Sequence, residues 1–181
     1  MKIYTRKGDD GTTGLLFGDR VRKDAPAPMA YGAVDEAQAA LGLARAETTP
    51  GGDLDVILIG LERDLWVLMA DLATAPASRA KLEPGVSLVT EAMVEALEAS
   101  IDTISDRFEM PTEFVVPGQN RTSALLDVAR TVVRRAERDA IAVVADDSAA
   151  VRYLNRLSDL VWTLARWQEG EALTARPHIT D

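Results

Sequence analysis

Apolar residues recur about every 3.6 positions along five stretches of this chain, and this periodicity limits what the chain can fold into. The clearest stretch runs from about 53 to 74, where leucine stands at positions 54, 58, 61, 65, 68 and 72. The others begin after Pro26 and Pro28 and near residues 87, 120 and 148, with the last reaching about residue 169. Signals for β-strands are nearly absent. The sequence therefore predicts an all-α protein, a five-helix bundle of the ferritin-like up-and-down type.

Proline, glycine and serine mark where these helices should begin and end. Pro76 stops the second helix, and Pro84 with Gly85 forms a loop before the third. Ser87 is the expected N-cap of the third helix. The fourth helix is expected over about 120–145, after a proline-containing loop at 108–118 with a short extended piece.

The length of 181 residues suits one domain that covers 1–181. We expect a polar N-terminal segment at 1–25, the helical bundle at 26–170 and a tail at 171–181. No apolar signal region opens the chain, and charged residues interrupt every long apolar run. A cytoplasmic protein is the expectation.

Composition excludes several classes of site. The net charge is -9 and the basic residues are clustered, which argues against a nucleic acid or an anionic membrane as the main partner. There is no cysteine and one histidine, His178. A histidine-based catalytic triad, a thiolate or multi-histidine zinc site and a histidine-containing di-iron site are therefore excluded, and no protein ligands for a metal ion can be identified.

Residues 5–14, Thr-Arg-Lys-Gly-Asp-Asp-Gly-Thr-Thr-Gly, contain no apolar side chain. Glycine backbone N–H groups, hydroxyls and cations are the groups that hold phosphate in anion-binding loops. The segment matches neither the Walker pattern nor a dinucleotide fingerprint. A solvated N-terminal tail is the plain alternative. The density of such groups, close to Lys23, favours a nucleotide-binding segment.

The fourth helix is expected to carry charge opposite its core stripe of Leu125, Ala129, Val132, Ala136, Ala140 and Val143. Arg130, Arg134 and Arg138 follow one another at intervals of one turn, with Asp127 and Glu137 beside them. Such a face can be simply solvated and paired along the helix. It can also hold a phosphate, because arginine grips phosphate oxygens with two parallel hydrogen bonds.

The polar face expected on the last helix also has two interpretations, a binding surface or a simply solvated face. Tyr153, Leu157, Leu160, Leu164 and Trp167 form its expected core stripe, and the far side carries Asn155, Asp159, Trp162 and Arg166. An indole on a polar face indicates contact with a ligand or another subunit. One exposed tryptophan without a role is the alternative.

Three groups of residues together resemble one family, the PduO-type ATP:cob(I)alamin adenosyltransferases. The N-terminal part comprises residues 4–14, 20–24 and 30–36, the C-terminal signatures are residues 129–138 and 153–159, and residues 71–74 match a further short piece. These motifs cover nearly the whole chain in the family's order.

The resemblance implies a homotrimer with its active site between adjacent subunits. It implies that ATP phosphates are bound by Thr5, Arg6, Lys7, Gly8, Asp9, Gly11, Thr12, Thr13 and Lys23. A neighbouring subunit would complete the nucleotide site with Arg130, Arg134, Glu137 and Asn155. Asp35 would pair with Arg130 across the interface, and Phe114 would lie beside the corrinoid cobalt. Arg134, Arg130, Phe114 and Asp35 are the residues expected to carry catalysis.

The implied reaction transfers the 5′-deoxyadenosyl group of ATP to cob(I)alamin and releases triphosphate, with Mg²⁺ assisting. Because the reduced cobalt is the nucleophile, no protein nucleophile is required. A cobalamin reductase and an adenosylcobalamin-dependent acceptor enzyme are the implied partners. Two departures from the family pattern, Gln119 for a usual glycine and Asp127 for a usual histidine, concern the corrinoid side. A trimeric carrier that binds ATP or corrinoid without catalysis is the alternative.

Overall fold

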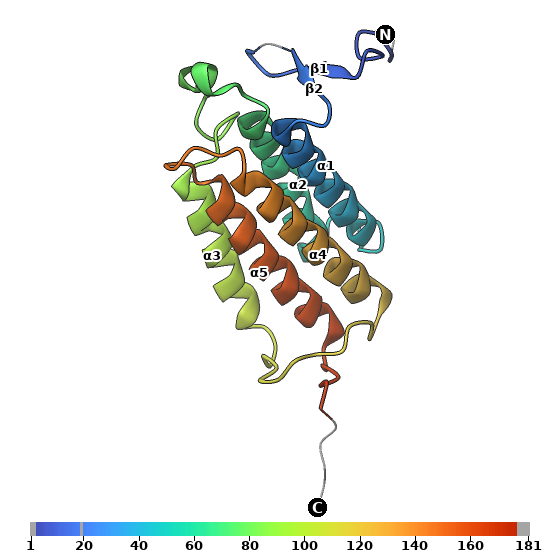
Figure 1. The fold of residues 1–181 in the computed structure, drawn as a ribbon. Helices are drawn as coiled ribbons and strands as arrows, with labels where there is room; N and C mark the ends of the chain where they lie inside the picture. Colours follow the sequence, from blue (N-terminus) through green and yellow to red (C-terminus); the bar gives the residue numbers. More distant parts are fainter. Residues whose placement is uncertain (1–2, 19, 177–181) are drawn as a thin grey trace, which may run out of the picture.

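A two-stranded hairpin precedes five α-helices in the part of the chain that the structure, a computed structural model, describes: residues 3–18 and 20–176. The strands are β1 (Thr12–Gly14) and β2 (Arg20–Arg22). The helices are α1 (Pro26–Arg45), α2 (Asp53–Leu72), α3 (Glu91–Ser105), α4 (Arg121–Ile141) and α5 (Ala150–Glu169), with a short 3-10 helix at Pro76–Lys81 (Figure 1). The predicted helical bundle is confirmed. His178 and the end of the expected tail lie outside the described residues.

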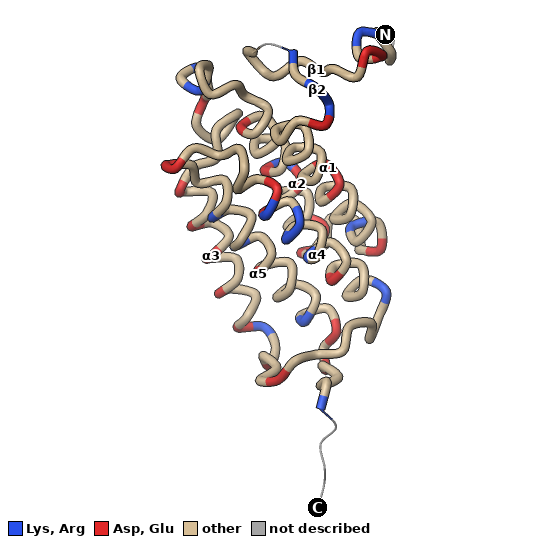
Figure 2. Tube along the Cα trace, in the orientation of Figure 1, with Lys and Arg blue, Asp and Glu red and all other residues tan. Residues whose placement is uncertain are grey.

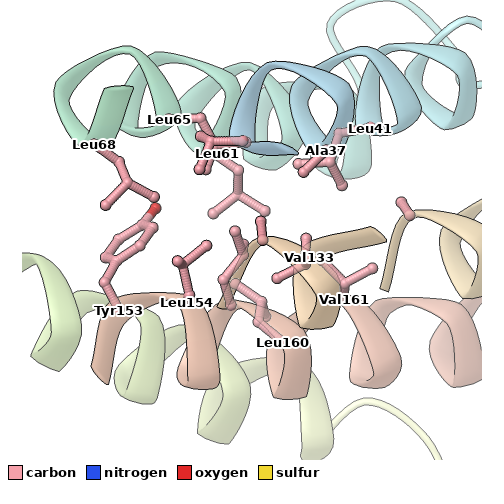
Figure 3. Close-up of a cluster of buried hydrophobic side chains, with 14 of the residues drawn as sticks. Ala37, Leu41, Leu61, Leu65, Leu68, Val133, Tyr153, Leu154, Leu160 and Val161 are labelled. Carbon is pink, nitrogen blue, oxygen red and sulfur yellow. The ribbon is translucent and has the colours of Figure 1, made fainter. Parts of the chain in front are cut away.

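The helices pack in the order α2, α1, α4, α5, α3, so that α4 lies between α1 and α5 (Figure 1). The core between them is built mainly from leucine, valine and alanine. Figure 3 shows α2 and α1 contributing Leu61, Leu65, Leu68, Ala37 and Leu41 toward Val133 of α4 and Tyr153, Leu154, Leu160 and Val161 of α5. Burying a leucine side chain contributes about 1.5–3 kcal/mol, so this cluster holds α4 and α5 rigidly in place.

Tyr153 forms a buried hydrogen bond that links two helices of that core. Its side chain is fully buried, and its hydroxyl donates to Asp64 Oδ2 of α2 at 3.0 Å. Figure 3 shows the hydroxyl reaching toward α2 beside Leu68. Burial raises the pKa of Asp64, and the hydrogen bond from Tyr153 opposes that rise. The pair fixes α5 against α2 at one register.

The helix boundaries follow local capping chemistry. The Asn120 side chain accepts from Ser123 N at 2.9 Å in a capping box, which starts α4 at Arg121. The expected Ser87 N-cap is wrong. Ser87 Oγ instead accepts from Glu83 N in the preceding turn, and Thr90 caps α3. The expected end of the fourth helix near residue 145 is also wrong, since α4 ends at Ile141.

The predicted outer faces of α4 and α5 are partly wrong. On α4 the fully buried apolar residues are Leu126, Ala129, Val133, Ala136 and Ala140, whereas Leu125 and Val132 are only half-buried. Asp127 and Arg166, both expected to face outward, are 5% and 3% exposed. They pair with each other, and this pairing makes the burial of both charges possible.

The β1–β2 hairpin was not expected, because its three-residue strands are too short to show alternation. It pairs Thr12 with Arg22 and Gly14 with Arg20 in antiparallel register. In Figure 1 the hairpin stands beyond the end of the bundle, next to the start of α1. No helix among the described residues is long and apolar enough to cross a membrane.

Candidate functional site

The N-terminal segment folds so that its predicted phosphate-binding groups lie together. Lys23 follows β2 and donates its backbone N–H to Gly11 O at 2.9 Å. A Cβ added to Gly8 would lie 3.1 Å from Lys23 Nζ and 3.2 Å from Thr12 O. Gly11 has φ +80°, which favours glycine. The hairpin thus brings an ammonium group against a glycine-containing turn, an arrangement that suits phosphate oxygens.

Arg20 holds this segment in shape, although sequence reasoning did not select it as a site residue. Its guanidinium donates to Lys7 O, to Thr12 O at 3.1 Å and to Thr12 Oγ1 at 2.7 Å. Thr12 in turn donates its hydroxyl and its N–H to Asp10 Oδ1 at 2.7 and 2.9 Å. These hydrogen bonds, the hydroxyl's first, hold the pKa of Asp10 below its usual value. The Thr12 hydroxyl is therefore already engaged with protein groups.

The remaining predicted residues of this segment are Thr5, Arg6, Lys7, Asp9 and Thr13. Thr13 is half-buried in β1, and the other four are exposed in the preceding turn. Arg6 has φ 61°, and its guanidinium lies 5.5 Å from the centre of the Tyr4 ring. Basic and acidic residues both occur along this segment, as the blue and red parts of the trace in Figure 2 show. The exposed Arg6 and Lys7 side chains are accessible to an anion from solvent.

On the bundle, α4 and α5 bring two predicted residues into contact. Asn155 Nδ2 donates to Glu137 Oε1 at 3.1 Å, and Arg156 Nη1 donates to Asn155 Oδ1 at 2.8 Å. Glu137 and Asn155 also border a cavity of about 380 Å³ with α3. The two helices therefore present one continuous polar surface at this point.

The three arginines on one face of α4, Arg130, Arg134 and Arg138, differ in exposure and in their partners. Arg130 is half-buried and its Nε lies 3.2 Å from Asp127 Oδ1. Arg134 and Arg138 are exposed, and Arg138 Nη1 donates to the carbonyl oxygen of Arg134 at 2.8 Å. Among the described residues, Arg134 forms no ion pair. Its charge is available to a ligand.

A cleft of about 570 Å³ lies between the loop at 111–117 and helices α4 and α5. Phe114 borders it and is 90% exposed. The floor carries Asp127, Arg130, Trp162 and Arg166. A solvent-exposed apolar ring beside paired charges in a cleft is typical of a binding site for a large ligand.

The loop that carries Phe114 is held by the segment after α5. Val116 N donates to Leu173 O at 2.8 Å, and Ala175 N donates to Phe114 O at 2.7 Å. Val115 and Thr174 form the antiparallel bridge between them. The expected short extended piece within 108–118 is thus confirmed.

Some predicted partners do not meet within one chain. No hydrogen bond or ion pair among residues 3–18 and 20–176 joins the N-terminal segment to Arg130, Arg134, Glu137 or Asn155. Asp35 lies exposed on α1, in a groove of about 550 Å³ that α2 borders with Trp66. The carboxylate beside Arg130 is Asp127 of the same chain. The pairing of Asp35 with Arg130 across an interface stays a prediction.

No group of three or more histidine, cysteine, aspartate or glutamate side chains in the described part of the chain could hold a metal ion.

The profile of the cobalamin adenosyltransferase family matches residues 3–168, from the N-terminal segment through α5. The chain belongs to this family. The resemblance read from the sequence is thereby confirmed.

Relatives within the cobalamin adenosyltransferase family match over most of their length. The corrinoid adenosyltransferase of Mycobacterium tuberculosis (strain ATCC 25618 / H37Rv) is 42% identical over 170 residues, 91% of this chain and 87% of the relative. That of Citrobacter freundii is 40% identical over 171 residues, 93% and 95% of the two chains.

A solved structure of the PduO-type ATP:corrinoid adenosyltransferase from Lactobacillus reuteri, a phenylalanine-to-alanine variant complexed with cobalamin and ATP, superposes with a TM-score of 0.85. It is 27% identical and covers 97% of this chain and 99% of its own. An arginine-to-lysine variant of the same enzyme, complexed with ATP, gives a TM-score of 0.84.

Proposed function

We propose that this chain is a corrinoid adenosyltransferase that moves the 5′-deoxyadenosyl group of ATP to the cobalt of cob(I)alamin. The observation that carries the proposal is the cleft of about 570 Å³ beside the first half of α4, which the exposed Phe114 and the half-buried Arg130 both border. The solved Lactobacillus reuteri relative is complexed with cobalamin and ATP, the two substrates that this reaction requires.

In this reaction the electron pair of cobalt(I) forms a bond to C5′ of ATP while the C5′–O bond breaks. The leaving group is triphosphate, which carries away the bonding pair. The protein contributes positioning and charge stabilisation, which are the usual means of catalysis when the substrates supply the chemistry.

The chain's own residues divide between the two substrates. The turn at Gly8 with Lys23 binds phosphates, and Arg134 supplies a free charge to the same triphosphate from a neighbouring subunit. Glu137 and Asn155, already hydrogen-bonded to each other, complete the nucleotide site. Phe114 lies against the cobalt and excludes an axial water.

Mg²⁺ would enter bound to the phosphates of ATP. The described residues offer no cluster of carboxylates for a separate metal site, so the triphosphate oxygens are the ligands that fit this hard cation.

We propose that a second chain completes the site, in the homotrimer that the family resemblance implies. One side of α2 leaves Val56, Arg63 and Trp66 in water, with Trp66 67% exposed. This surface borders the groove that contains Asp35. Large apolar side chains exposed to water, such as Val56 and Trp66, favour a contact between chains here. A neighbouring α4 placed there would bring Arg130 to Asp35.

Two further partners follow from the reaction. Cob(I)alamin must be formed by one-electron reduction of cob(II)alamin, so we propose a reductase as the supplier. An adenosylcobalamin-dependent enzyme would accept the product. Cytoplasmic location is part of the same proposal.

The test is to mix the protein with ATP, Mg²⁺ and chemically reduced cob(I)alamin in the absence of oxygen. We expect the absorption spectrum of adenosylcobalamin to develop together with one equivalent of triphosphate. Binding of both ligands without either product would instead identify a non-catalytic carrier. Release of phosphate or diphosphate would refute the proposed bond cleavage.

A further inference from the structure

Asp127 bridges two arginines on the floor of the cleft. Its Oδ1 lies 3.2 Å from Arg130 Nε on the same helix, and its Oδ2 accepts from Arg166 Nη2 on α5 at 2.5 Å. The Asp127 side chain is 7% exposed. One carboxylate thus connects α4 to α5 where both helices border the cleft.

The two arginines depend on Asp127 to different degrees. Arg166 has a second carboxylate, Glu169, at 2.9 Å from its Nε and 3.0 Å from its Nη2. The Arg166 side chain is 2% exposed, so it is surrounded by protein. Among the described residues, Arg130 has Asp127 alone as a carboxylate partner, and its side chain is 28% exposed. Removal of Asp127 therefore leaves Arg166 paired and Arg130 unpaired.

We infer that Asp127 is a positioning residue for Arg130, which it orients from inside the same helix before any substrate or neighbouring subunit arrives. An arginine side chain has many rotamers, and a partner that selects one of them in advance removes an ordering step from binding. The inference rests on the proposed function, in which Arg130 belongs to the active site.

The bridge between Arg130 and Arg166 depends on residue 127 being a carboxylate. A carboxylate offers an oxygen to each of two guanidinium groups. A neutral histidine at this place would have one acceptor nitrogen and could not bridge both. A charged histidine would repel them. Asp127 therefore provides an internal partner for Arg130 that a histidine cannot supply.

The experiment compares Asp127→Asn with a matched control, Glu169→Gln. Both changes remove one negative charge from a buried carboxylate that contacts Arg166, but only Asp127 contacts Arg130. We expect Asp127→Asn to lower kcat about tenfold, the scale of one charge-assisted hydrogen bond, and Glu169→Gln to lower it less than twofold. If the two variants lose activity equally, Asp127 only neutralises Arg166 and the inference is wrong.

A double-mutant cycle isolates the pair. In an Arg130→Ala background, Asp127→Asn should change kcat less than twofold, because the residue that it positions is gone. A further tenfold loss in that background would overturn the inference. If Asp127→Asn does not fold, Asp127→Glu serves in its place, since it keeps the charge but moves the carboxylate, and the same two outcomes apply.

A readout independent of catalysis separates this inference from the proposed function. The Nε–H signal of Arg130 in nuclear magnetic resonance, assigned with Arg130→Lys, should exchange slowly with water in the wild type and in Glu169→Gln. It should exchange rapidly in Asp127→Asn. Equal exchange in all three proteins refutes the positioning role, whereas an inactive wild type with the expected exchange refutes only the function.

Discussion

Arg134→Ala separates a ligand-binding role for the arginine face from a structural one. Arg134 is exposed and forms no ion pair among the described residues, and Arg138 contacts only its carbonyl oxygen, which alanine keeps. Replacing it also relieves two like-charge neighbours one turn away, each worth about 0.2–0.5 kcal/mol. We expect the free energy of unfolding without ATP to be unchanged or up to about 1 kcal/mol higher.

The effect on activity should be far larger. A charge-assisted hydrogen bond to triphosphate contributes about 1.5–3 kcal/mol, or roughly ten- to a hundredfold. Because charge grows on the leaving triphosphate, kcat should fall more than ATP affinity does. Initial rates of adenosylcobalamin formation and calorimetric titration with ATP measure the two quantities. Arg134→Lys should recover only part of the rate, because lysine lacks the planar fork.

Arg135→Ala is the matched control. Arg135 is the next residue on α4, is exposed, and pairs with Glu36 of α1. We expect less than a twofold change in rate, because an exposed ion pair contributes little. Full activity of Arg134→Ala, or a clear loss of its stability without nucleotide, would refute the site assignment.

Three further predictions concern other parts of the molecule. Phe114→Ala should abolish most turnover from cob(II)alamin and leave ATP affinity and stability near wild type, since the ring is 90% exposed; unchanged turnover would remove Phe114 from the site. Asp35→Asn should weaken the proposed trimer in sedimentation by leaving Arg130 with one carboxylate fewer, and a monomeric wild type at micromolar concentration would contradict the proposed interface. Tyr153→Phe should lower the free energy of unfolding by about 1–2 kcal/mol at neutral pH, because the ionised Asp64 loses a donor. That loss should shrink as the pH falls through the pKa of Asp64, which burial raises, since a protonated carboxyl is a weaker acceptor; a loss independent of pH would refute the role of the charge.

The sequence predicted the helices well because their leucine spacing is strong and long. On α4 it placed Ala129, Ala136 and Ala140 correctly in the core but chose Leu125 and Val132 in place of the buried Leu126 and Val133. It also placed Asp127 and Arg166 on outer faces, and the reason for that error is physical. Asp127 and Arg166 are 39 positions apart, and each is buried with an opposite charge from the other helix beside it. A pattern of apolar residues along one helix cannot reveal a partner on another. Each charge therefore looked like a surface residue.

In the candidate site, too, some residues could be predicted from the sequence and others could not. The glycines, Lys23 and Thr12 of the N-terminal segment were recognised by their chemistry, and the hairpin does bring them together. Arg20 was missed because its role depends on contacts with the backbone of Lys7 and Thr12, which any residue type offers. The one signal that could have indicated it is its place within the resembling N-terminal run.

The bridge between the Phe114 loop and the segment after α5 has an evolutionary consequence. Because its two hydrogen bonds use the backbone N–H groups of Val116 and Ala175, almost any side chain can be accepted at these positions without loss of the bridge. Proline is the exception, since it has no N–H to donate. Related chains should therefore vary freely here yet avoid proline at both places, and the ring above the cleft could keep its position through long sequence drift.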